Sequence, residues 1–338
     1  MTTHGSLRVG ACLSVTGKYA RFGRQAAQGL RAWQALDPGA DVRIEDDGSE
    51  PDRVAPVLAE LAAECHLLLG PYSSELTRAA AAAVRGMDGL LWNHGGAADD
   101  VQSSAPGALV SVLTPATRYA RPFLLLAARQ RPTGPLVVVP GRGRFGRQVT
   151  AGARVLAEKL GVVAIAGRAE GPGFGGGTAE AWDLLCAGSF EEDVKAVRWA
   201  RGLPRPPRSI CAVAAGVQEF GSALSDPEGV HGMAQWFPGT VGSPDLGPSE
   251  TELLGAYAAL GGSRPDYPAI QAAAAAGLAV ACARRARTTA RDALWQAACT
   301  LDVRTLFGRF RIDPATGLQL GHETVLVRWG ERGLEAAV

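Results

Sequence analysis

Residues 21–31 read Arg-Phe-Gly-Arg-Gln-Ala-Ala-Gln-Gly-Leu-Arg, and residues 144–154 read Arg-Phe-Gly-Arg-Gln-Val-Thr-Ala-Gly-Ala-Arg. Each copy follows an apolar run and a short loop and opens an amphipathic stretch, which is the pattern of a strand, a loop and a helix. Because the two segments share both their residues and their place in this pattern, we interpret the chain as two similar lobes. Each lobe is expected to present its first strand–helix loop toward a shared crevice.

Short apolar runs separated by helical patterns predict a doubly wound parallel sheet in each lobe. In the first lobe we expect strands at residues 7–13, 42–46, 66–69, 90–93 and 109–113, and helices at 24–36, 52–64 and 74–85. In the second lobe we expect strands at 136–139, 162–166, 182–186 and 210–214, and helices at 148–160 and 191–201. Alanine-rich helices are then expected between residues 249 and 301, followed by strands at 306–312 and 324–329.

Composition narrows the class of protein. A chain of 338 residues that is 47% hydrophobic can bury the cores of two domains. Its 34 basic and 33 acidic residues give a net charge of +1, which argues against direct nucleic-acid binding. No uninterrupted apolar run of membrane-spanning length occurs, so no membrane insertion is expected. The six cysteines stand singly inside apolar segments, without a CxxC pair, and are interpreted as reduced core thiols.

The first residues do not combine a basic segment with an apolar run, so the sequence shows no signal peptide. On this evidence we expect a cytoplasmic protein. The alternative is an extracytoplasmic protein whose export signal is missing from this sequence.

Signals for catalysis are nearly absent. The sequence has no P-loop, no HExxH and no GxSxG, and its five histidines lack the spacing of metal ligands, so no enzyme, cofactor or metal site is expected. The adjacent acids Asp46–Asp47 and Asp99–Asp100 are interpreted as solvated turn residues. Gly141–Gly146 matches GxGxxG after a predicted strand, which leaves an NAD(P)-dependent enzyme open as the alternative. Against it, the first copy of the repeat has no GxG, and no acid closes the next strand.

Two loops favour binding instead. Residues 67–74 run from a buried strand into Ser73 and Ser74, which stand at a helix start where unpaired amides favour an anion. Ser74 could equally cap that helix, and both roles can hold together. Residues 91–97 end in Gly95 and Gly96, which would let backbone approach a ligand closely. Both loops follow the C-terminal ends of strands in one sheet, which is where open α/β folds bind ligands.

Four segments together resemble one family, the type I periplasmic binding proteins, which are also described as Leu/Ile/Val-binding-protein-like. Residues 7–23 resemble its opening strand and loop, and residues 46–52 its acidic strand end. Residues 69–74 resemble its ligand loop, and residues 310–329 its closing element. The family includes branched-chain amino acid ABC transporter substrate-binding proteins and the cytoplasmic amide-sensing regulator.

The resemblance implies two α/β lobes joined by three crossover segments, with a ligand cleft between them. It places lobe one at residues 1–117 and 239–319 and lobe two at 118–238 and 320–338. It implies a non-enzymatic protein that closes by a hinge around a small molecule and delivers it to an ABC permease or signals to a regulatory partner. The ligand-binding residues that it implies are Tyr19, Tyr72, Ser73, Ser74, His94, Gly95, Gly96 and Ala97 in lobe one and Phe145, Ser189, Phe190 and Ala215 in lobe two.

Departures from the family pattern bear on the ligand. Amino-acid receptors place an acid after the second-lobe strand to hold the ammonium group, whereas this sequence has Ala215 there and Glu219 further on. An unpaired buried ammonium would be costly. Phe145 stands where a tyrosine is frequent, and Ala97 where a threonine is frequent. We therefore expect a carboxylate- or amide-bearing ligand with an apolar or aromatic body.

Overall fold

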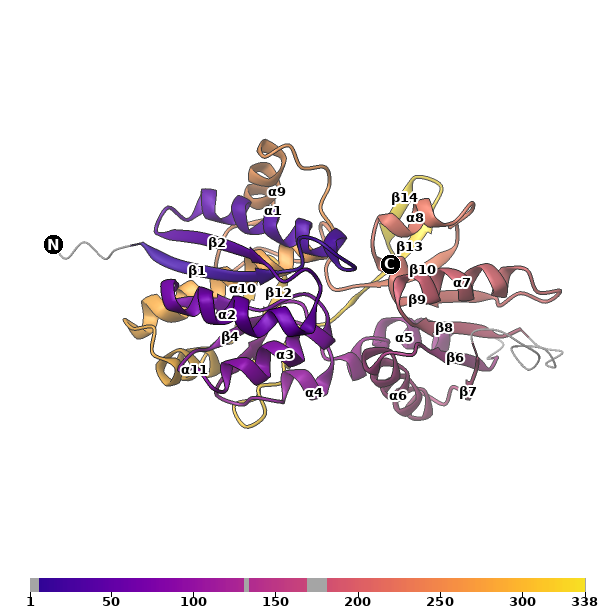
Figure 1. The fold of residues 1–338 in the computed structure, drawn as a ribbon. Helices are drawn as coiled ribbons and strands as arrows, with labels where there is room; N and C mark the ends of the chain where they lie inside the picture. The colour runs from indigo at the N-terminus through magenta and orange to yellow at the C-terminus, as the bar shows by residue number, and fades with distance from the viewer. Residues whose placement is uncertain (1–5, 131–133, 169–180, 338) are drawn as a thin grey trace. The chain divides into compact units, whose positions relative to one another are not determined.

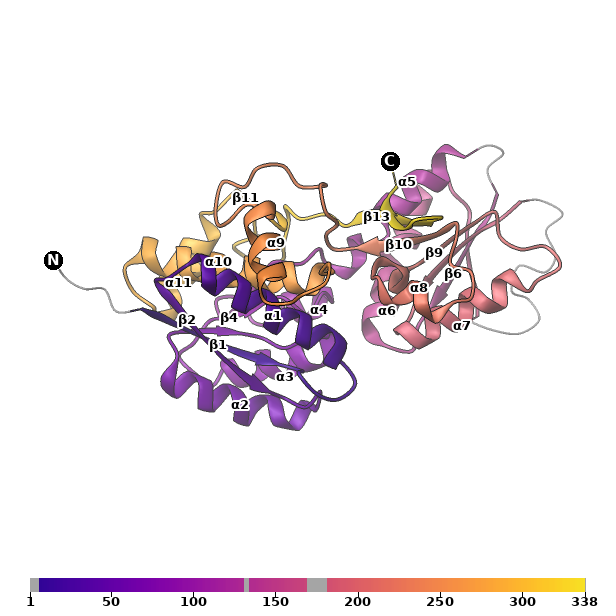
Figure 2. The ribbon, with the colours of Figure 1, turned by 90° about the horizontal axis from the view of Figure 1, so that it is seen from above.

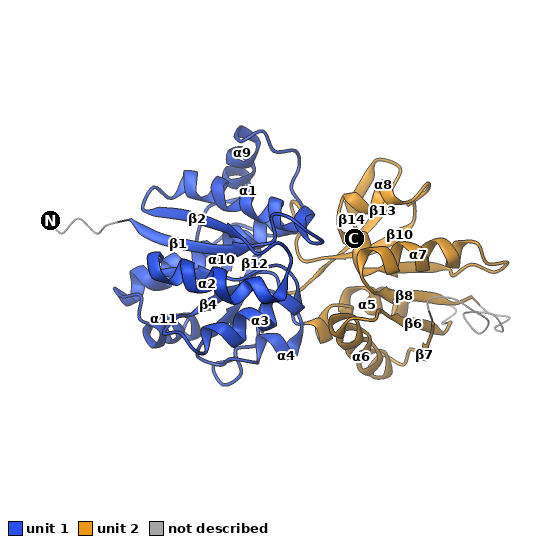
Figure 3. Cartoon of the chain, viewed as in Figure 1, with its two compact units in different colours: residues 1–115, 241–322 blue, residues 116–240, 323–338 orange. Residues whose placement is uncertain are grey.

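The computed structural model describes residues 6–130, 134–168 and 181–337. The chain divides into two compact units, unit 1 (Met1–Pro115 with Val241–His322) and unit 2 (Ala116–Thr240 with Glu323–Val338), which Figure 3 colours separately. The chain therefore passes between the units three times. The sequence-based boundaries, at 117/118, 238/239 and 319/320, lie beside those of the structure, at 115/116, 240/241 and 322/323.

Unit 1 is built on a parallel sheet with the order β2-β1-β3-β4-β5. Its strands are β1 (Leu7–Leu13), β2 (Ala40–Asp46), β3 (Leu67–Leu69), β4 (Leu91–Asn93) and β5 (Leu109–Ser111). Its helices are α1 (Ala20–Leu36), α2 (Pro51–Glu64), α3 (Ser74–Val84), α4 (Asp99–Gln102), α9 (Glu250–Ala259), α10 (Tyr267–Ala286) and α11 (Arg291–Cys299). Helices α1, α9 and α10 pack together over one face of the sheet and α2 and α3 over the other (Figures 1 and 2). The strands are therefore covered on both faces, which explains their continuous apolar runs.

Unit 2 repeats this topology. Its parallel strands are β6 (Leu136–Pro140), β7 (Ala164–Ala166), β8 (Asp183–Ala187), β9 (Ser209–Ala212) and β10 (Val230–Ala234). Their order, β7-β6-β8-β9-β10, is that of unit 1, and β13 (Val325–Gly330) and β14 (Gly333–Ala336) extend the sheet antiparallel beyond β10. The helical elements are η1 (Ala116–Arg118), α5 (Arg121–Arg129), α6 (Arg144–Lys159), α7 (Phe190–Arg201), η2 (Val213–Gly216) and α8 (Glu219–Ala223). The strand order therefore supports the duplication inferred from the repeat.

The repeat itself is a packing motif. Gly29 in α1 and Gly152 in α6 occupy equivalent positions in the two copies. A Cβ on Gly29 would lie 2.2 Å from the carbonyl oxygen of Ala269, and one on Gly152 would lie 2.0 Å from that of Thr117. Each glycine therefore lets its helix approach neighbouring backbone more closely than any side chain would allow.

Several expected elements differ in the structure. The strand expected at 306–312 is instead a hairpin of β11 (Val303–Thr305) and β12 (Gly308–Phe310), because the chain turns into Gly308 at a φ of +138°. The helices α1 and α6 begin four residues before the expected positions 24 and 148, since each repeat's Arg-Phe-Gly segment already forms the first turn. The prediction for 210–214 was too long, because the strand gives way to η2. Helix α5 and strands β10 and β14 were not predicted.

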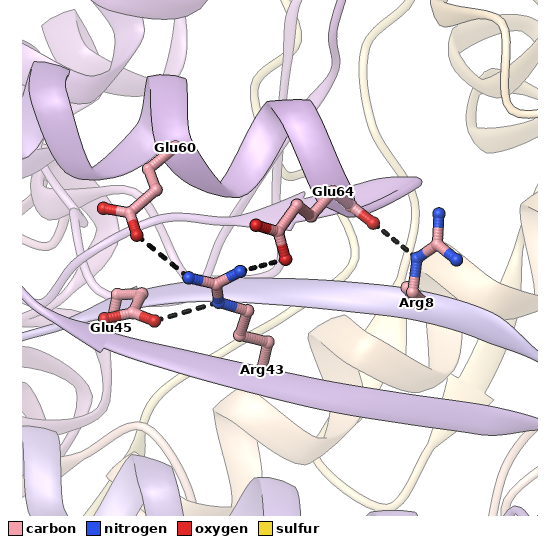
Figure 4. A network of polar contacts seen from close by, with 5 residues as sticks. All are labelled: Arg8, Arg43, Glu45, Glu60 and Glu64. Atoms are coloured by element: carbon pink, nitrogen blue, oxygen red, sulfur yellow. Dashed lines mark hydrogen bonds and ion pairs between the residues drawn. The ribbon is translucent and has the colours of Figure 1, made fainter.

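Charged side chains cover strand β2 at the edge of the unit 1 sheet. The Arg43 guanidinium contacts Glu45 at 2.9 Å, Glu60 at 2.9 Å and Glu64, while Arg8 donates to the backbone carbonyl of Glu64 (Figure 4). These contacts join β1 and β2 to helix α2. Because an uncovered edge strand can pair with another chain, this ion network helps to protect the edge of the sheet.

Candidate ligand-binding site

The serine loop, residues 70–74, joins β3 to α3. Ser73 caps the helix, because its Oγ accepts a 3.3 Å hydrogen bond from the amide of Leu76, whereas Ser74 is the first helical residue. The interpretation of Ser74 as the cap was therefore wrong. The Ser74 Oγ instead accepts a 3.1 Å hydrogen bond from the amide of Ala98. Each hydroxyl is an acceptor in these contacts, and no described residue accepts the proton of either, so both protons are left to donate.

Ser73 has a strained backbone. Its φ of +84° lies in the left-handed region, which glycine adopts readily and residues with a Cβ adopt rarely and at an energetic cost. Such a conformation costs on the order of 1–3 kcal/mol and is commonly retained at functional sites. The amide of Ser73 is held at 3.1 Å by the carbonyl of Gly95, so the neighbouring glycine loop stabilises this geometry.

The glycine loop, residues 94–98, follows β4 and is packed tightly. Asn93 holds it, because its side-chain oxygen accepts from the amides of Gly95 at 3.1 Å and Gly96 at 2.8 Å. A Cβ on Gly95 would lie 2.2 Å from the carbonyl oxygen of Pro71, and one on Gly96 would lie 2.5 Å from the hydroxyl of Thr77. The close approach that these glycines allow is therefore to the serine loop and helix α3.

His94 lies beneath these loops with its side chain fully buried. Burial lowers the pKa of its imidazole to about 4, so the ring is neutral at physiological pH. The nearby backbone of Gly70 acts in the opposite direction on this pKa, but burial prevails. Its neighbour Ala97 is also buried, with 7% of its surface exposed. Of the predicted residues in this loop, Gly95 is thus the one that is partly exposed.

The opening loop between β1 and α1 is held by an acid from the next strand. Asp46 accepts hydrogen bonds from the amides of Val15 at 2.8 Å and Thr16 at 3.1 Å, from the Thr16 hydroxyl at 2.6 Å, and from the amide of Gly48 at 3.0 Å. Partial burial works to raise the pKa of Asp46, but these hydrogen bonds prevail and hold it below its usual value. The carboxylate therefore joins the first two strand–helix loops.

The second acid of this pair is not a solvated turn residue. Asp47 is fully buried, accepts a 2.7 Å hydrogen bond from the amide of Ser49 and lies 3.7 Å from the thiol sulfur of Cys12. Burial raises its pKa above the ordinary value. The expectation was wrong because these partners come from a turn and a strand that close over the side chain.

Aromatic side chains gather beside the serine loop. Phe22 stacks on Tyr72, with ring centroids 4.3 Å apart and planes 14° apart, and Tyr19 lies 6.2 Å from Tyr72. The hydroxyl of Tyr72 lies 3.0 Å from that of Tyr267 at the start of α10. The structure therefore brings together the predicted residues Tyr19 and Tyr72. Sequence reasoning missed Phe22, which the repeat could have indicated through its partner Phe145, and Tyr267, which no signal placed here.

In unit 2, Phe145 occupies the position equivalent to Phe22. Its ring meets that of Tyr119 edge to face, with centroids 5.3 Å apart. Phe145 is half-buried in the first turn of α6. Each repeat thus places a phenylalanine against a tyrosine of its own unit.

Ser189 and Phe190 open helix α7 after β8. Ser189 forms a capping box with Glu192, and its exposed hydroxyl accepts from the Glu192 amide at 3.2 Å. Phe190 is half-buried and lies 6.2 Å from the ring of Phe220. Phe220 in turn lies 6.4 Å from Trp329, whose indole donates to the carbonyl of Ala215 at 3.0 Å. A row of aromatic rings therefore connects Phe190 to Ala215, which is itself fully buried.

Asp193 is a buried acid that sequence reasoning missed. Its two carboxylate oxygens accept from the amides of Gly188 at 2.7 Å and Ala214 at 2.9 Å, so it joins the loops that follow β8 and β9. Burial raises its pKa to about 7. Because each oxygen is held by a backbone amide, this carboxylate positions the two loops.

Packing accounts for the GxGxxG match. A Cβ on Gly141 would lie 2.4 Å from the Cα of Gly188, and one on Gly146 would lie 1.9 Å from the carbonyl oxygen of Ala187. Gly143 has open space around it. The first and last glycines of the match thus let α6 pack against the end of β8, with no need of a pyrophosphate.

Other kinds of site find little support in the described parts of the chain. A depression of about 530 Å³ in unit 2 lies between Thr117–Arg121 and the second half of α6 and includes none of the predicted binding residues. Among residues 6–130, 134–168 and 181–337, no cluster of acids, histidines and cysteines could hold a metal ion, and no helix has the length and apolar character to span a membrane.

No family model matches the chain, and no curated protein matches its sequence. Solved structures do match its fold. A leucine-binding protein from Thermotoga maritima is 15% identical, with 98% of each chain covered and a TM-score of 0.81. A branched-chain amino acid transporter substrate-binding protein from Streptococcus pneumoniae, solved with isoleucine, is 15% identical over 98% of this chain and 99% of that chain, with a TM-score of 0.77.

A third similar structure is the solute-binding protein of an ABC transporter from Rhodopseudomonas palustris, solved in complex with 4-hydroxybenzoate. It is 16% identical over 98% of this chain and 95% of that chain, with a TM-score of 0.75. These likenesses span nearly the whole chain and confirm the fold that the sequence motifs predicted. The chain therefore has the fold of the type I periplasmic binding proteins.

Proposed function

We propose that this protein is a non-enzymatic solute-binding protein that captures a small carboxylate-bearing molecule on the serine loop of unit 1. The observation that carries the proposal is the set of hydrogen-bond donors at the start of α3. The Ser73 and Ser74 hydroxyls each keep a proton to donate. The first amides of a helix have no intrahelical partner, and the helix dipole favours an anion there.

The neighbouring aromatic group supports an apolar or aromatic body for the ligand. Tyr19, Phe22 and Tyr72 lie together beside the donors. The R. palustris protein of the same fold was solved with 4-hydroxybenzoate, a molecule of this chemistry. We further propose that Phe145, Ser189 and Phe190 of unit 2 contribute to binding the same ligand.

A free amino acid fits these residues less well than an organic acid. An α-ammonium group in a closed site needs a carboxylate partner. The sequence has Ala215 at the position after β9 that would supply this partner, and Glu219 lies further on in α8. One similar structure is a leucine-binding protein and another was solved with isoleucine. We therefore include these two amino acids in the test as competitors, not as the proposed ligands.

The test is calorimetric titration with 4-hydroxybenzoate, 3,4-dihydroxybenzoate, leucine and isoleucine. We expect saturable binding of an aromatic acid that Ser74→Ala weakens by about 1–3 kcal/mol, since a desolvated acceptor loses its donor. The matched control is Ser222→Ala in α8, whose hydroxyl donates to the carbonyl of Glu219 and should not affect binding. Unchanged affinity in Ser74→Ala would show that the ligand binds elsewhere.

The six cysteines favour a second role, as an intracellular ligand sensor. All six are free thiols, and four of them are buried. Free thiols are more common in reducing compartments, whereas delivery to an ABC permease requires an extracytoplasmic protein. Fractionation of native cells separates the two roles, because a transport protein is recovered outside the cytoplasm and a sensor within it.

A further inference from the structure

The side chain of Gln102, at the end of α4, is fully buried and joins three separate segments of unit 1. Its amide nitrogen donates to the carbonyl of Ala97 at 3.3 Å and to that of Leu113 at 3.1 Å. Its oxygen accepts from the amide of Gln319 at 3.2 Å. One side chain therefore contacts the glycine loop and both segments, around 113 and 319, that lead to crossings between the units.

Gln319 continues this network away from the glycine loop. Its side chain, with 1% of its surface exposed, donates to the carbonyl of Val112 at 3.3 Å and accepts from the amides of Arg311 at 3.1 Å and Gly321 at 2.8 Å. Beyond it, His322 lies 2.6 Å from the hydroxyl of Thr114. The two crossing segments, which we define as residues 112–115 and 318–322, are thus joined by buried hydrogen bonds.

The other end of the network reaches the proposed ligand loop. Gln102 bonds the carbonyl of Ala97, and the next residue, Ala98, donates its amide to the Ser74 hydroxyl. Asn93 adds a parallel link, since its side chain bonds Gly96 and lies 3.1 Å from the Ser111 hydroxyl in β5. Buried polar groups of this kind hold a fixed geometry, because each lost bond leaves a desolvated group unpaired.

We propose that Gln102 is a positioning residue that couples the glycine loop to both crossing segments, so that a ligand held by the binding loops changes the mobility of the crossings. The proposal rests on the proposed function for the identity of the binding loops. The coupling itself is a property of the unliganded protein and can be measured without a ligand.

The first experiment compares amide hydrogen exchange, resolved by NMR, in wild type and Gln102→Met, which keeps the side-chain volume and removes all three hydrogen bonds. The informative amides do not bond to Gln102: those of Gly95 and Gly96, held by Asn93, and that of Gly321, held by Gln319. We expect all of them to exchange about tenfold faster while the amide of Val9 in β1 is unchanged.

Gln319→Met is the matched control. It removes a buried glutamine from the crossing segment at 318–322 but keeps all three hydrogen bonds of Gln102. It should therefore accelerate exchange at Gly321 directly, and at Gly95 and Gly96 less than Gln102→Met does. Two results for Gln102→Met would overturn the coupling. One is faster hydrogen exchange at the Gln319 amide alone, and the other is an equal increase in the exchange rate of every amide, including that of Val9. If Gln102→Met does not fold, Gln102→Asn, whose shorter side chain cannot span all three partners, is judged by the same amides.

The second experiment adds 4-hydroxybenzoate. In wild type we expect slower exchange at both Gly95 and Gly321, and in Gln102→Met slower exchange at Gly95 alone. Protection at Gly95 without protection at Gly321 in wild type would overturn the coupling. Absence of any binding to wild type would instead count against the proposed ligand class, and the unliganded comparison would still decide the role of Gln102.

Discussion

Substitution of Ser73 separates its structural role from its proposed role in binding. Its φ of +84° imposes strain on any residue with a Cβ, and its hydroxyl caps α3 through Leu76. Ser73→Ala keeps the strain and loses the cap, which costs about 1 kcal/mol of stability. Ser73→Gly removes strain of about 1–3 kcal/mol, loses a few tenths of a kcal/mol of capping, and adds about 0.5–1 kcal/mol of unfolded-state entropy.

The expected order of unfolding free energy is therefore Ser73→Gly equal to or above wild type, and wild type above Ser73→Ala. The two variants should differ by about 1–2 kcal/mol in urea denaturation. Binding should respond differently, because both variants lack the hydroxyl. A lost hydrogen bond to a charged acceptor corresponds to about 10- to 100-fold weaker binding of 4-hydroxybenzoate in each.

The reasoning is refuted in two separable ways. Equal stability of Ser73→Gly and Ser73→Ala would show that the backbone at this position is not strained. Wild-type affinity in both variants would show that the hydroxyl does not contact the ligand, whatever the stabilities are.

Three further predictions concern unit 2. Because burial raises the pKa of Asp193 to about 7, above the ordinary 3.8, its contribution to stability is full below about pH 4 and lost as the pH rises through 7. The unfolding free energy of wild type relative to Asp193→Asn should thus fall over this range, and a constant difference would contradict it. Gly152→Ala should destabilise by about 1–3 kcal/mol, because the new Cβ meets the Thr117 carbonyl; unchanged thermal stability would argue against this packing. Glu219→Gln should leave binding of 4-hydroxybenzoate unchanged; micromolar binding of leucine that this substitution abolishes would reveal an ammonium site.

The repeat was the most informative part of the sequence. Its two copies predicted two similar lobes, and the strand orders of the two units are the same. The prediction of two lobes was correct because residues shared by the two copies, such as Gly29 and Gly152, determine how a helix packs on neighbouring backbone. The starts of α1 and α6 were predicted four residues late, since the Arg-Phe-Gly segment of each copy does not continue the apolar periodicity of the helix.

Roles that depend on distant residues could not be predicted. Asp46 and Asp47 look like an exposed acidic pair, yet the first binds amides of the loop 30 residues earlier and the second is buried beside Cys12. Nothing in the sequence singled out Gln102, because its three hydrogen-bond partners come from different parts of the chain. Burial of His94 likewise depends on how its loop packs and on no local pattern.

The arrangement of donors and acceptors at the serine loop argues for a negatively charged ligand group. Two acceptors in this region already make hydrogen bonds: the Gly95 carbonyl accepts from the Ser73 amide, and the Asn93 side-chain oxygen accepts from two glycine-loop amides. Donors remain, in the form of two hydroxyl protons and the amides of Ser74 and Glu75, since the Leu76 amide already donates to the Ser73 cap. A site that offers donors next to a positive helix end stabilises a carboxylate and gains little from an ammonium. We therefore expect the charge of the ligand to depend on which hydrogen bonds the loops already make among themselves, as much as on which residue types line them.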